Sequence, residues 1–520
     1  MAKASSGSLG SENKNSDPFT QSALLPIPLL AISLLSLRKR SKARPAGQGA
    51  TVVEVEQSKR SDQMAPPPSR VRVLDRIRVS PPLSDSEQQP ALPLTFFDAA
   101  WLFTGPVERL FFFRHPDPVS TLPLLRSSLA RALHRFYPLA GSIRPHAPFL
   151  CSYTHGTDAL SLVVAESDSP NDFDRLVDRS PRDLVEIRPL VPQLPPPGDD
   201  GTFALAAVQA TVFPSRGLCL GVSVHHAACD DASTMHFVRT WAAACRLGLD
   251  KDDGSEDAML PPLPVLDRSL IADPDDLLGR TLAGMMRLVP PPPPVSPPPQ
   301  QEVKTAMVMA SFLLPREQIN RIKEGAAAKT DAKATSFVAA SALAWVCLLK
   351  CGSVGVPSAQ RSHMLFSAEC RSRLTPRLPA EYFGNCLRPC FVEAATKDLL
   401  SGETADGVAA AASAIGSVIW EMEQGVLEGA EGWLGRVLSV LPVRPMSVGG
   451  SPRHGVYDST DFGWGRPARV EMVSVEKTPG TVALAKSPEG DGGIELGVVL
   501  PPEAMDAFSS CFAHALSTAI

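Results

Sequence analysis

The stretch from residue 218 to residue 248 most constrains the fold of this chain, because its hydrophobic period changes there from two to about 3.6. Residues 218–225 alternate as a strand does, and residues 232–248 carry apolar side chains at helical spacing. The segment HHAACDD, residues 225–231, joins the two. α/β proteins place reactive side chains in the crevice beyond the carboxyl end of a strand. The stretch therefore predicts an α/β fold with functional residues in this turn.

The turn concentrates side chains that can do chemistry. His226 continues the apolar face of the strand, and His225 points to the opposite face. Asp230 lies four positions after His226. This spacing suits a catalytic base with the acid that orients it, and it suits equally a core histidine followed by a helix N-cap. A metal site of His225, His226, Cys229 and Asp230 is disfavoured, because the two histidines face apart and no second group of ligands stands out.

The His-x-x-x-Asp spacing is weak evidence by itself. Ten histidines give about half a match by chance, and a second match runs from His454 to Asp458. That match lies in VGGSPRHGVYDSTD, a Gly-, Ser- and Pro-rich segment with no strand pattern leading into it. We therefore assign the function to the first match.

Composition and missing motifs exclude several classes of protein. A net charge of −5 over 520 residues gives no support to a nucleic-acid partner. The ten cysteines include no Cys-x-x-Cys pair, which favours free thiols in a reducing, cytoplasmic compartment. Neither a Gly-x-Ser-x-Gly elbow nor a phosphate-binding loop is present, and GWGRPA at 463–468 has Pro467 where a dinucleotide-binding helix would begin. Without an evident nucleophile, a lone histidine base suits direct transfer of an acyl group to a hydroxyl or amine.

The first 63 residues differ from the rest of the chain. They are polar and basic around an apolar run at 23–37, which contains two prolines and is shorter than the ~20 residues of a membrane-spanning helix. We expect residues 1–63 to be a disordered extension and expect no stable membrane span. Organelle targeting and weak anchoring by this segment stay open.

Two further segments of similar size flank a proline-rich one. Residues 64–268 mix predicted strands and helices and carry the His-x-x-x-Asp motif. Residues 269–303 are predicted to be a crossover linker, because eight prolines within 290–299 exclude helix and sheet. Residues 304–520 again combine predicted strands with predicted helices. The strands are expected at 305–314, 469–475 and 481–487, and the helices at 315–328, 335–351 and 501–520.

Three stretches, in this order, resemble motifs of the BAHD plant acyltransferases, which use acyl-coenzyme A. They are HHAACDD at 225–231, YFGNC at 382–386 and DFGWGRP at 461–467. YFGNC is similar to the branch that malonylates flavonoid and phenolic glycosides. The resemblance covers about residues 64–520. It implies two mixed α/β domains with a channel between them, in which coenzyme A and the acceptor enter from opposite ends.

The resemblance also implies roles for single residues. His226 is the general base, and Asp230 points away from the substrate and pairs with Arg371 of the second domain. The third motif forms a structural loop away from the chemistry, through Asp461, Gly463, Trp464 and Gly465. Acyl-coenzyme A is implied as a co-substrate, with no permanently bound cofactor and no metal.

Two residues depart from the family pattern. The family usually has Gly after the motif aspartate, where this chain has Asp231. Position 232, an arginine in some malonyl-using relatives, is Ala232 here. Because a malonyl carboxylate needs a cation, ideally a bidentate arginine, another basic residue must bind it or the donor carries a different acyl group.

The sequence thus predicts an acyl-CoA-dependent acyltransferase that moves an acyl group, malonyl first, to a hydroxyl of a phenolic or flavonoid glycoside without an acyl-enzyme. We expect a monomer that acts on small molecules. Other donors such as hydroxycinnamoyl-CoA and amine acceptors stay open. So do an acyl-CoA hydrolase and a catalytically inert acyl-CoA-binding protein of the same fold.

Overall fold

The computed structural model describes residues 71–82, 89–147, 149–169, 172–198, 201–249, 259–288, 306–329 and 334–518. The predicted extension 1–63 and the proline run 290–299 lie outside these ranges. The described part of the predicted linker is helical, with α7 (Leu277–Met286) packed against α2 (Phe96–Ala99). The division into domains at 64–268 and 304–520 stays a prediction.

The first sheet contains six strands, in the order β1-β6-β9-β10-β3-β15. Their bounds are β1 Val71–Val79, β6 Leu160–Ser167, β9 Ala206–Phe213, β10 Gly217–His225, β3 Pro106–Arg114 and β15 Arg469–Met472. All neighbours are antiparallel except β6 and β9. The alternating residues of β10 pack with α3 (Leu122–Arg135) and α6 (Asp231–Leu249), which cover one face of the sheet. This strand and helix confirm the period change expected at the turn.

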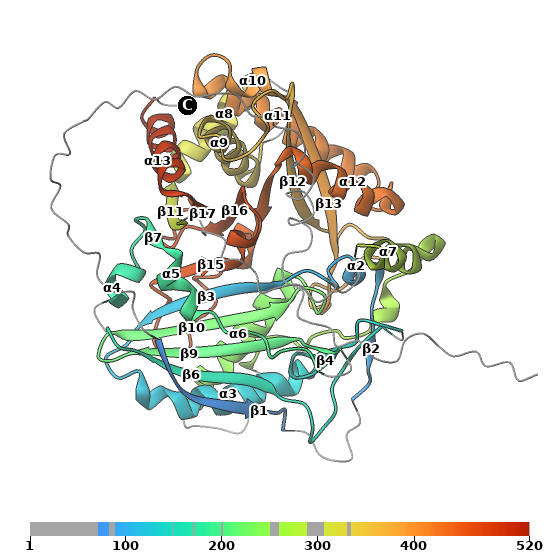
Figure 1. The fold of residues 1–520 in the computed structure, drawn as a ribbon, viewed down its shortest axis with the longest axis vertical. Coiled ribbons are helices and arrows are strands. Elements are labelled where there is room, and N and C mark those ends of the chain that lie inside the picture. The colour runs from blue at the N-terminus through green and yellow to red at the C-terminus, as the bar shows by residue number, and fades with distance from the viewer. Residues whose placement is uncertain are drawn as a thin grey trace, which may run out of the picture.

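The second sheet contains seven strands, in the order β13-β12-β14-β16-β17-β11-β7, and lies above the first in Figure 1. Their bounds are β13 Leu387–Ala395, β12 Arg361–Glu369, β14 Met446–Gly449, β16 Thr481–Lys486, β17 Ile494–Leu500, β11 Val308–Leu314 and β7 Arg182–Asp183. The pairs of β14 with β12 and with β16 are parallel, and the other pairs are antiparallel.

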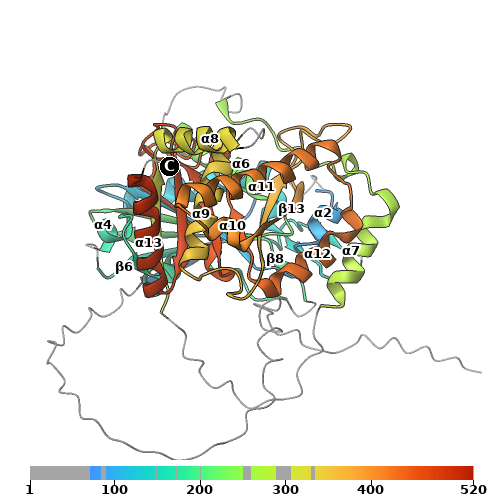
Figure 2. The same cartoon turned by 90° about the horizontal axis from the view of Figure 1, so that it is seen from above.

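Helices of the second half cover the outer face of this sheet, as the view from above shows (Figure 2). They are α8 Arg316–Lys329, α9 Ser336–Lys350, α10 Thr396–Leu400, α11 Thr404–Gln424 and α13 Pro502–Ser517. Helix α9 confirms the helix predicted at 335–351, and it is buried on all sides from Val338 to Leu348.

The remaining elements are short. A four-stranded sheet joins β2 Leu92–Pro93, β5 Leu150–Ser152, β4 Ser142–Ile143 and β8 Phe203–Ala204. The other α-helices are α4 Asp172–Leu176, α5 Leu184–Ile187 and α12 Trp433–Val440. The 3₁₀ turns are η2 Val119–Thr121, η3 Tyr137–Ala140, η4 Arg188–Leu190, η6 Arg268–Leu270, η7 Pro274–Asp276, η8 Ala430–Gly432, η9 Leu441–Val443, η10 Pro452–His454 and η11 Val473–Lys477.

Each large sheet includes a strand from the other half of the chain. Strand β15 pairs with β3 in the first sheet, and β7 pairs with β11 in the second. The mixed sheets and their covering helices confirm the predicted α/β class.

Two details of the sequence-based description were wrong. The segment before His454 does contain a strand, β14, which is short but paired on both sides in the middle of the second sheet. The strand expected at 469–475 ends at Met472, because the chain turns there into η11.

Candidate active site

The two histidines of the turn lie in different environments. His225, the last residue of β10, is buried; its ring stacks on Phe203, and its Nδ1 accepts a hydrogen bond from the backbone N–H of Ala227 at 3.2 Å. Burial lowers the pKa of His225 to about 4. This ring is therefore neutral at neutral pH and is engaged in packing.

His226 faces the other way and is partly exposed. Its ring lies parallel to the Trp101 ring, with centroids 3.8 Å apart, and its Nδ1 has no hydrogen-bond partner among the described residues. Burial lowers the pKa of His226 below 6.5, and the charge of Asp230 partly offsets this effect. The imidazole is thus neutral at neutral pH, which is the form that accepts a proton.

Asp230 is almost fully buried, and the hydrogen bonds that its carboxylate accepts do not come from the ring of His226. Its carboxylate accepts from both ends of the Arg371 guanidinium, at 2.8 and 3.0 Å, and from the backbone N–H groups of Ser233 and Cys386, at 3.0 and 3.2 Å. The bond from Ser233 is that of a helix N-cap for α6. Capping and ion pairing therefore coexist, and both fix the turn that carries His226.

The YFGNC loop, residues 382–386, contacts the turn through its backbone and Asn385. The Asn385 amide donates to the carbonyl of His226 at 2.8 Å and to Asp98 at 3.0 Å. The carbonyl of Gly384 accepts from Arg371, and a Cβ at Gly384 would overlap the guanidinium of Arg268. Glycine is required at 384 because a side chain would overlap Arg268. Asparagine is required at 385 because its amide donates to both His226 and Asp98.

A second buried ion pair next to the site was not predicted. Asp98 is fully buried and accepts from Arg268 at 3.2 Å, and Arg268 also donates to the carbonyl of Ala228 and to the hydroxyl of Tyr382. One feature of the sequence could have indicated a buried charge, namely the position of Asp98 within the apolar run TFFDAAW. Its partner lies 170 positions away, so the pairing could not be inferred from spacing.

Asp231 forms a third ion pair next to the site, and its side chain is 17% exposed. Its Oδ2 lies 3.0 Å from Nη2 of Arg109 and 3.2 Å from Nε2 of His454. Burial raises the pKa of Asp231, but Arg109 and His454 outweigh burial and hold the pKa below its usual value. The histidine of the second His-x-x-x-Asp match therefore lies at the site, which its sequence context did not indicate. Its spaced partner, Asp458, pairs instead with Lys486.

The DFGWG loop lies at the far end of α6. Asp461 accepts from the backbone N–H groups of Gly463 and Gly465, both of which have positive φ, at 2.7 and 2.9 Å. The carbonyl of Asp461 accepts from Arg246, near the end of α6. Trp464 stacks on the fully buried Phe462. Because α6 rises about 1.5 Å per residue, about 20 Å separates this loop from the His226 turn.

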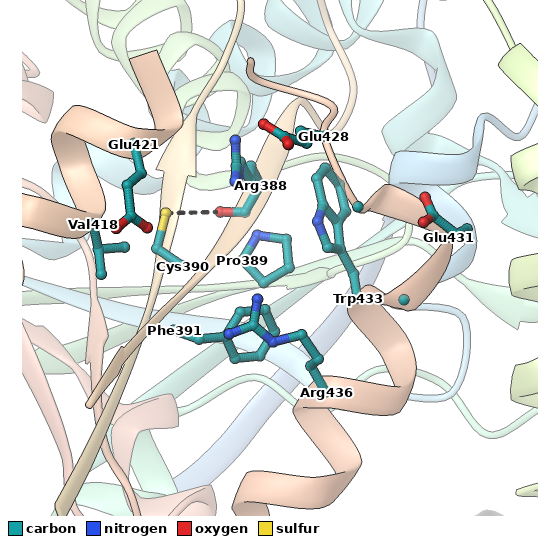
Figure 3. A pocket seen from close by; sticks show the side chains of 12 residues that line it. Arg388, Pro389, Cys390, Phe391, Val418, Glu421, Glu428, Glu431, Trp433 and Arg436 are labelled. Carbon is teal, nitrogen blue, oxygen red and sulfur yellow. Dashed lines mark hydrogen bonds between the residues drawn. The ribbon is translucent and has the colours of Figure 1, made fainter. Parts of the chain in front are cut away.

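A separate cavity of about 280 Å³ lies among β13, α11 and α12. Figure 3 shows Arg388, Arg436, Trp433 and Phe391 around it, and Arg436 lies over the Phe391 ring at 4.3 Å. None of the predicted site residues lines this cavity, so it is not the candidate active site.

Two further observations concern the parts of the chain that the structure describes. No three His, Cys, Asp or Glu side chains there are grouped to hold a metal ion. No helix in those ranges is long and apolar enough to cross a membrane.

Comparison with known proteins gives matches over most of the chain. A model of the Transferase family matches residues 70–515. A coumaroyl-CoA:anthocyanidin 3-O-glucoside-6''-O-coumaroyltransferase of Arabidopsis thaliana is 34% identical over 463 residues, covering 84% of this chain and 96% of the relative. A malonyl-coenzyme:anthocyanin 5-O-glucoside-6'''-O-malonyltransferase of Salvia splendens is 32% identical over 463 residues, covering 86% and 96%. The crystal structure of vinorine synthase matches the fold with a TM-score of 0.60 at 18% identity, over 84% of this chain and 96% of that one.

Proposed function

The chain belongs to the Transferase family, the BAHD acyl-CoA-dependent acyltransferases, and on that premise we propose that it transfers an acyl group from acyl-coenzyme A to a hydroxyl of a phenolic or flavonoid glycoside. The observation that carries this proposal is the environment of His226. Its ring is held against Trp101, it is neutral at neutral pH, and its backbone is fixed by Asn385.

The proposed mechanism is direct transfer within a ternary complex. Neutral His226 takes the proton of the acceptor hydroxyl, and the oxygen attacks the thioester carbonyl. The tetrahedral intermediate collapses, the C–S bond breaks, and the imidazolium returns the proton to the thiolate of coenzyme A. An acyl-enzyme on the nearby Cys229 is disfavoured, because burial raises the pKa of that thiol far above its usual value.

Asp230, Arg371 and Asn385 act as positioning residues in this proposal. Asp230 has four donors, and none of them is the ring of His226. It therefore holds the turn and does not polarise the base by direct contact. Asp461, Gly463, Trp464 and Gly465 stabilise a loop remote from the chemistry.

The structure supports two acyl donors for different reasons. Malonyl is the donor that the sequence predicts, and Arg109, beside the His226 turn, is the cation that could bind its carboxylate. A hydroxycinnamoyl group is the second donor, because the charge of Arg109 is already matched by Asp231. One relative is named for malonyl transfer and another for coumaroyl transfer.

We also propose a compartment and an oligomeric state for the protein. All ten cysteines are free in the structure, which supports a reducing compartment such as the cytoplasm. We propose that the chain acts as a monomer on small molecules, with the two substrates meeting at His226.

The first test is thiol release from malonyl-CoA and from p-coumaroyl-CoA with a flavonoid glucoside as acceptor. We expect acceptor-dependent release that falls about 10²–10⁴-fold in His226→Ala. The matched control is His363→Ala, a histidine of β12 that lies beside Glu393. Release without an acceptor would indicate a hydrolase. Binding of acyl-CoA without turnover would indicate an inert binding protein, and activity of His226→Ala within a few-fold of wild type would refute the assignment of the base.

A further inference from the structure

The group formed by Arg109, Asp231 and His454, here called the Asp231 cluster, joins three elements beside the proposed base. Arg109 lies on β3, opposite Val222 of β10. Asp231 is the first residue of α6, and His454 ends η10. Residues 109, 231 and 454 are far apart in the sequence, and the fold brings them into contact. Asp231 is also one of the two positions at which the sequence departs from the family pattern.

The cluster carries no net charge at neutral pH. Asp231 and Arg109 cancel one another in a pair at 3.0 Å, and the Arg109 side chain is 7% exposed. Burial lowers the pKa of His454 below 6.5, and the charge of Asp231 offsets this only in part, so His454 is neutral. A carboxylate entering this site would bring an unmatched buried charge.

Two polar atoms of the cluster are buried and have no hydrogen-bond partner among the described residues. One is Nη1 of Arg109, a donor, and the other is Oδ1 of Asp231, an acceptor. Buried polar groups are normally paired, and leaving them unpaired is costly. A hydroxyl group offers both functions that these atoms lack, because it accepts from a guanidinium and donates to a carboxylate. A carboxylate satisfies only the guanidinium and is repelled by Asp231.

The cluster lies next to the proposed chemistry. Asp231 follows His226 by five positions in one tight turn, and its charge raises the pKa of His226. The Nδ1 atom of His226 is a third buried atom with no partner among the described residues. The proposed base and the unpaired acceptor atom of the cluster thus belong to one turn, and Arg109 is paired with that same aspartate.

We propose that the Asp231 cluster binds a hydroxyl group of a substrate beside His226 and thereby selects a hydroxyl over a carboxylate at this position. The proposal rests on the acyl-transfer function proposed above. The hydroxyl comes either from the phenol of a hydroxycinnamoyl donor or from a sugar carbon next to the reacting hydroxyl of the acceptor. Arg109 and Asp231 are thus specificity-determining residues for the reaction.

The experiment compares substrates that differ in one hydroxyl. The donor pair is p-coumaroyl-CoA with cinnamoyl-CoA, and malonyl-CoA is tested beside them as the donor with a carboxylate. Acceptor pairs are a flavonoid glucoside with its 2-, 3- and 4-deoxyglucoside analogues. The variants are Asp231→Gly, the usual residue of the family, and Asp231→Asn, which keeps the size of the side chain. The matched control is Asp458→Asn, which removes an exposed carboxylate from the same segment as His454.

In the wild-type protein we expect one pair to differ at least about 10-fold in kcat/KM in favour of the hydroxylated member. Asp231→Gly should bring that ratio close to one and raise kcat/KM for malonyl-CoA relative to p-coumaroyl-CoA. The control should keep the wild-type ratios. The donor series responds if the phenol binds, and the acceptor series responds if the sugar binds.

Unchanged ratios in Asp231→Gly for both series would overturn the inference. So would a wild-type preference for malonyl-CoA that Asp231→Gly abolishes. If no donor is turned over, the proposed function fails, and binding then tests the cluster on its own. Quenching of the intrinsic tryptophan fluorescence, to which Trp101 beside His226 contributes, measures the Kd of p-coumaroyl-CoA and cinnamoyl-CoA. Equal Kd values for these two thioesters, together with equal Kd values for the glucoside and each deoxyglucoside, would then refute the inference.

Discussion

Around His226, two buried aspartates and the partly exposed Asp231 each face an arginine from a distant part of the chain. Asp98 pairs with Arg268, Asp230 with Arg371, and Asp231 with Arg109. Each pair neutralises its charge inside the protein and connects the turn to another element. A lone buried charge would cost several kcal/mol. Removing one partner should therefore be more harmful than removing both.

Replacing Asp230 with Asn leaves the buried Arg371 with only the partly exposed Glu369, at 3.2 Å, as a counter-charge and should destabilise the protein by about 3 kcal/mol. Urea unfolding, monitored by fluorescence, measures this change. The double variant Asp230→Asn/Arg371→Gln should lose less than the sum of the single variants. A normal unfolding midpoint together with lost activity would mean that Asp230 takes part in the chemistry directly.

His225 should make the protein sensitive to acid. Its pKa is about 4 in the folded state and 6.5 in the reference state, so the unfolded chain binds the proton more tightly. The resulting stability is complete above pH 6.5 and is lost as the pH falls to 4, a loss of about 3 kcal/mol. His225→Asn, whose amide oxygen can accept from the N–H of Ala227, should lose correspondingly less between pH 7 and pH 4. Parallel stability curves for the two proteins would contradict this explanation.

At the scale of elements, the site is a strand–turn–helix held from behind by a loop of the second half. Strand β10 and helix α6 place His226 at their junction, and the YFGNC loop contacts the carbonyl of His226 and the carboxylate of Asp230. The contact is close enough that Gly384 has no room for a side chain.

Gly384→Ala should therefore disturb the site through the backbone. Its Cβ would displace the guanidinium of Arg268 and weaken the pair with Asp98, so we expect a lower melting temperature and a large drop in kcat. The matched control is Gly435→Ala on α12, where a Cβ meets nothing within 4 Å and helix propensity favours Ala by about 1 kcal/mol. Wild-type kinetics and melting in Gly384→Ala would show that the loop can move back.

At the scale of the whole molecule, the two sheets are joined by exchanged strands and by a buried ionic group. Glu471 of β15 pairs with Arg182 of β7 at 2.7 Å, and both side chains are almost fully buried. Arg469 of β15 pairs with Glu495 of β17. The strand that extends the first sheet is thus bound to residues of the second sheet.

Glu471→Gln should weaken the junction between the sheets by about 3–5 kcal/mol, because Arg182 keeps its charge in a buried site. Hydrogen exchange of peptides from β9 and β17 should show that both sheets lose protection together. The control is Glu476→Gln, which removes a partner of the exposed Arg188 and should cost about 1 kcal/mol or less. Faster exchange in β17 alone would show that the sheets open independently.

The sequence by itself determined the elements and the identity of the turn. Hydrophobic period is a local property, so β10, α6 and α13 could be predicted from spacing, and α9 from its continuous apolar run. The HHAACDD, YFGNC and DFGWG motifs indicated the family for the same reason, since each is a contiguous stretch. Strand β14 was missed because its support comes from the strands paired on both of its sides.

Only the tertiary structure decided which charges meet. Asp231 and Arg109 are 122 positions apart, and His454 lies further along the chain still. Composition allows every aspartate many arginine partners, and the choice depends on which backbone segments pack against each other. For this reason Asp231, which departs from the family pattern, and His454, whose motif the sequence analysis disfavoured, are neighbours in space. The pairing of charges inside the protein depends on residues that are far apart in the sequence, whereas the hydrophobic period depends only on residues that are close together in it.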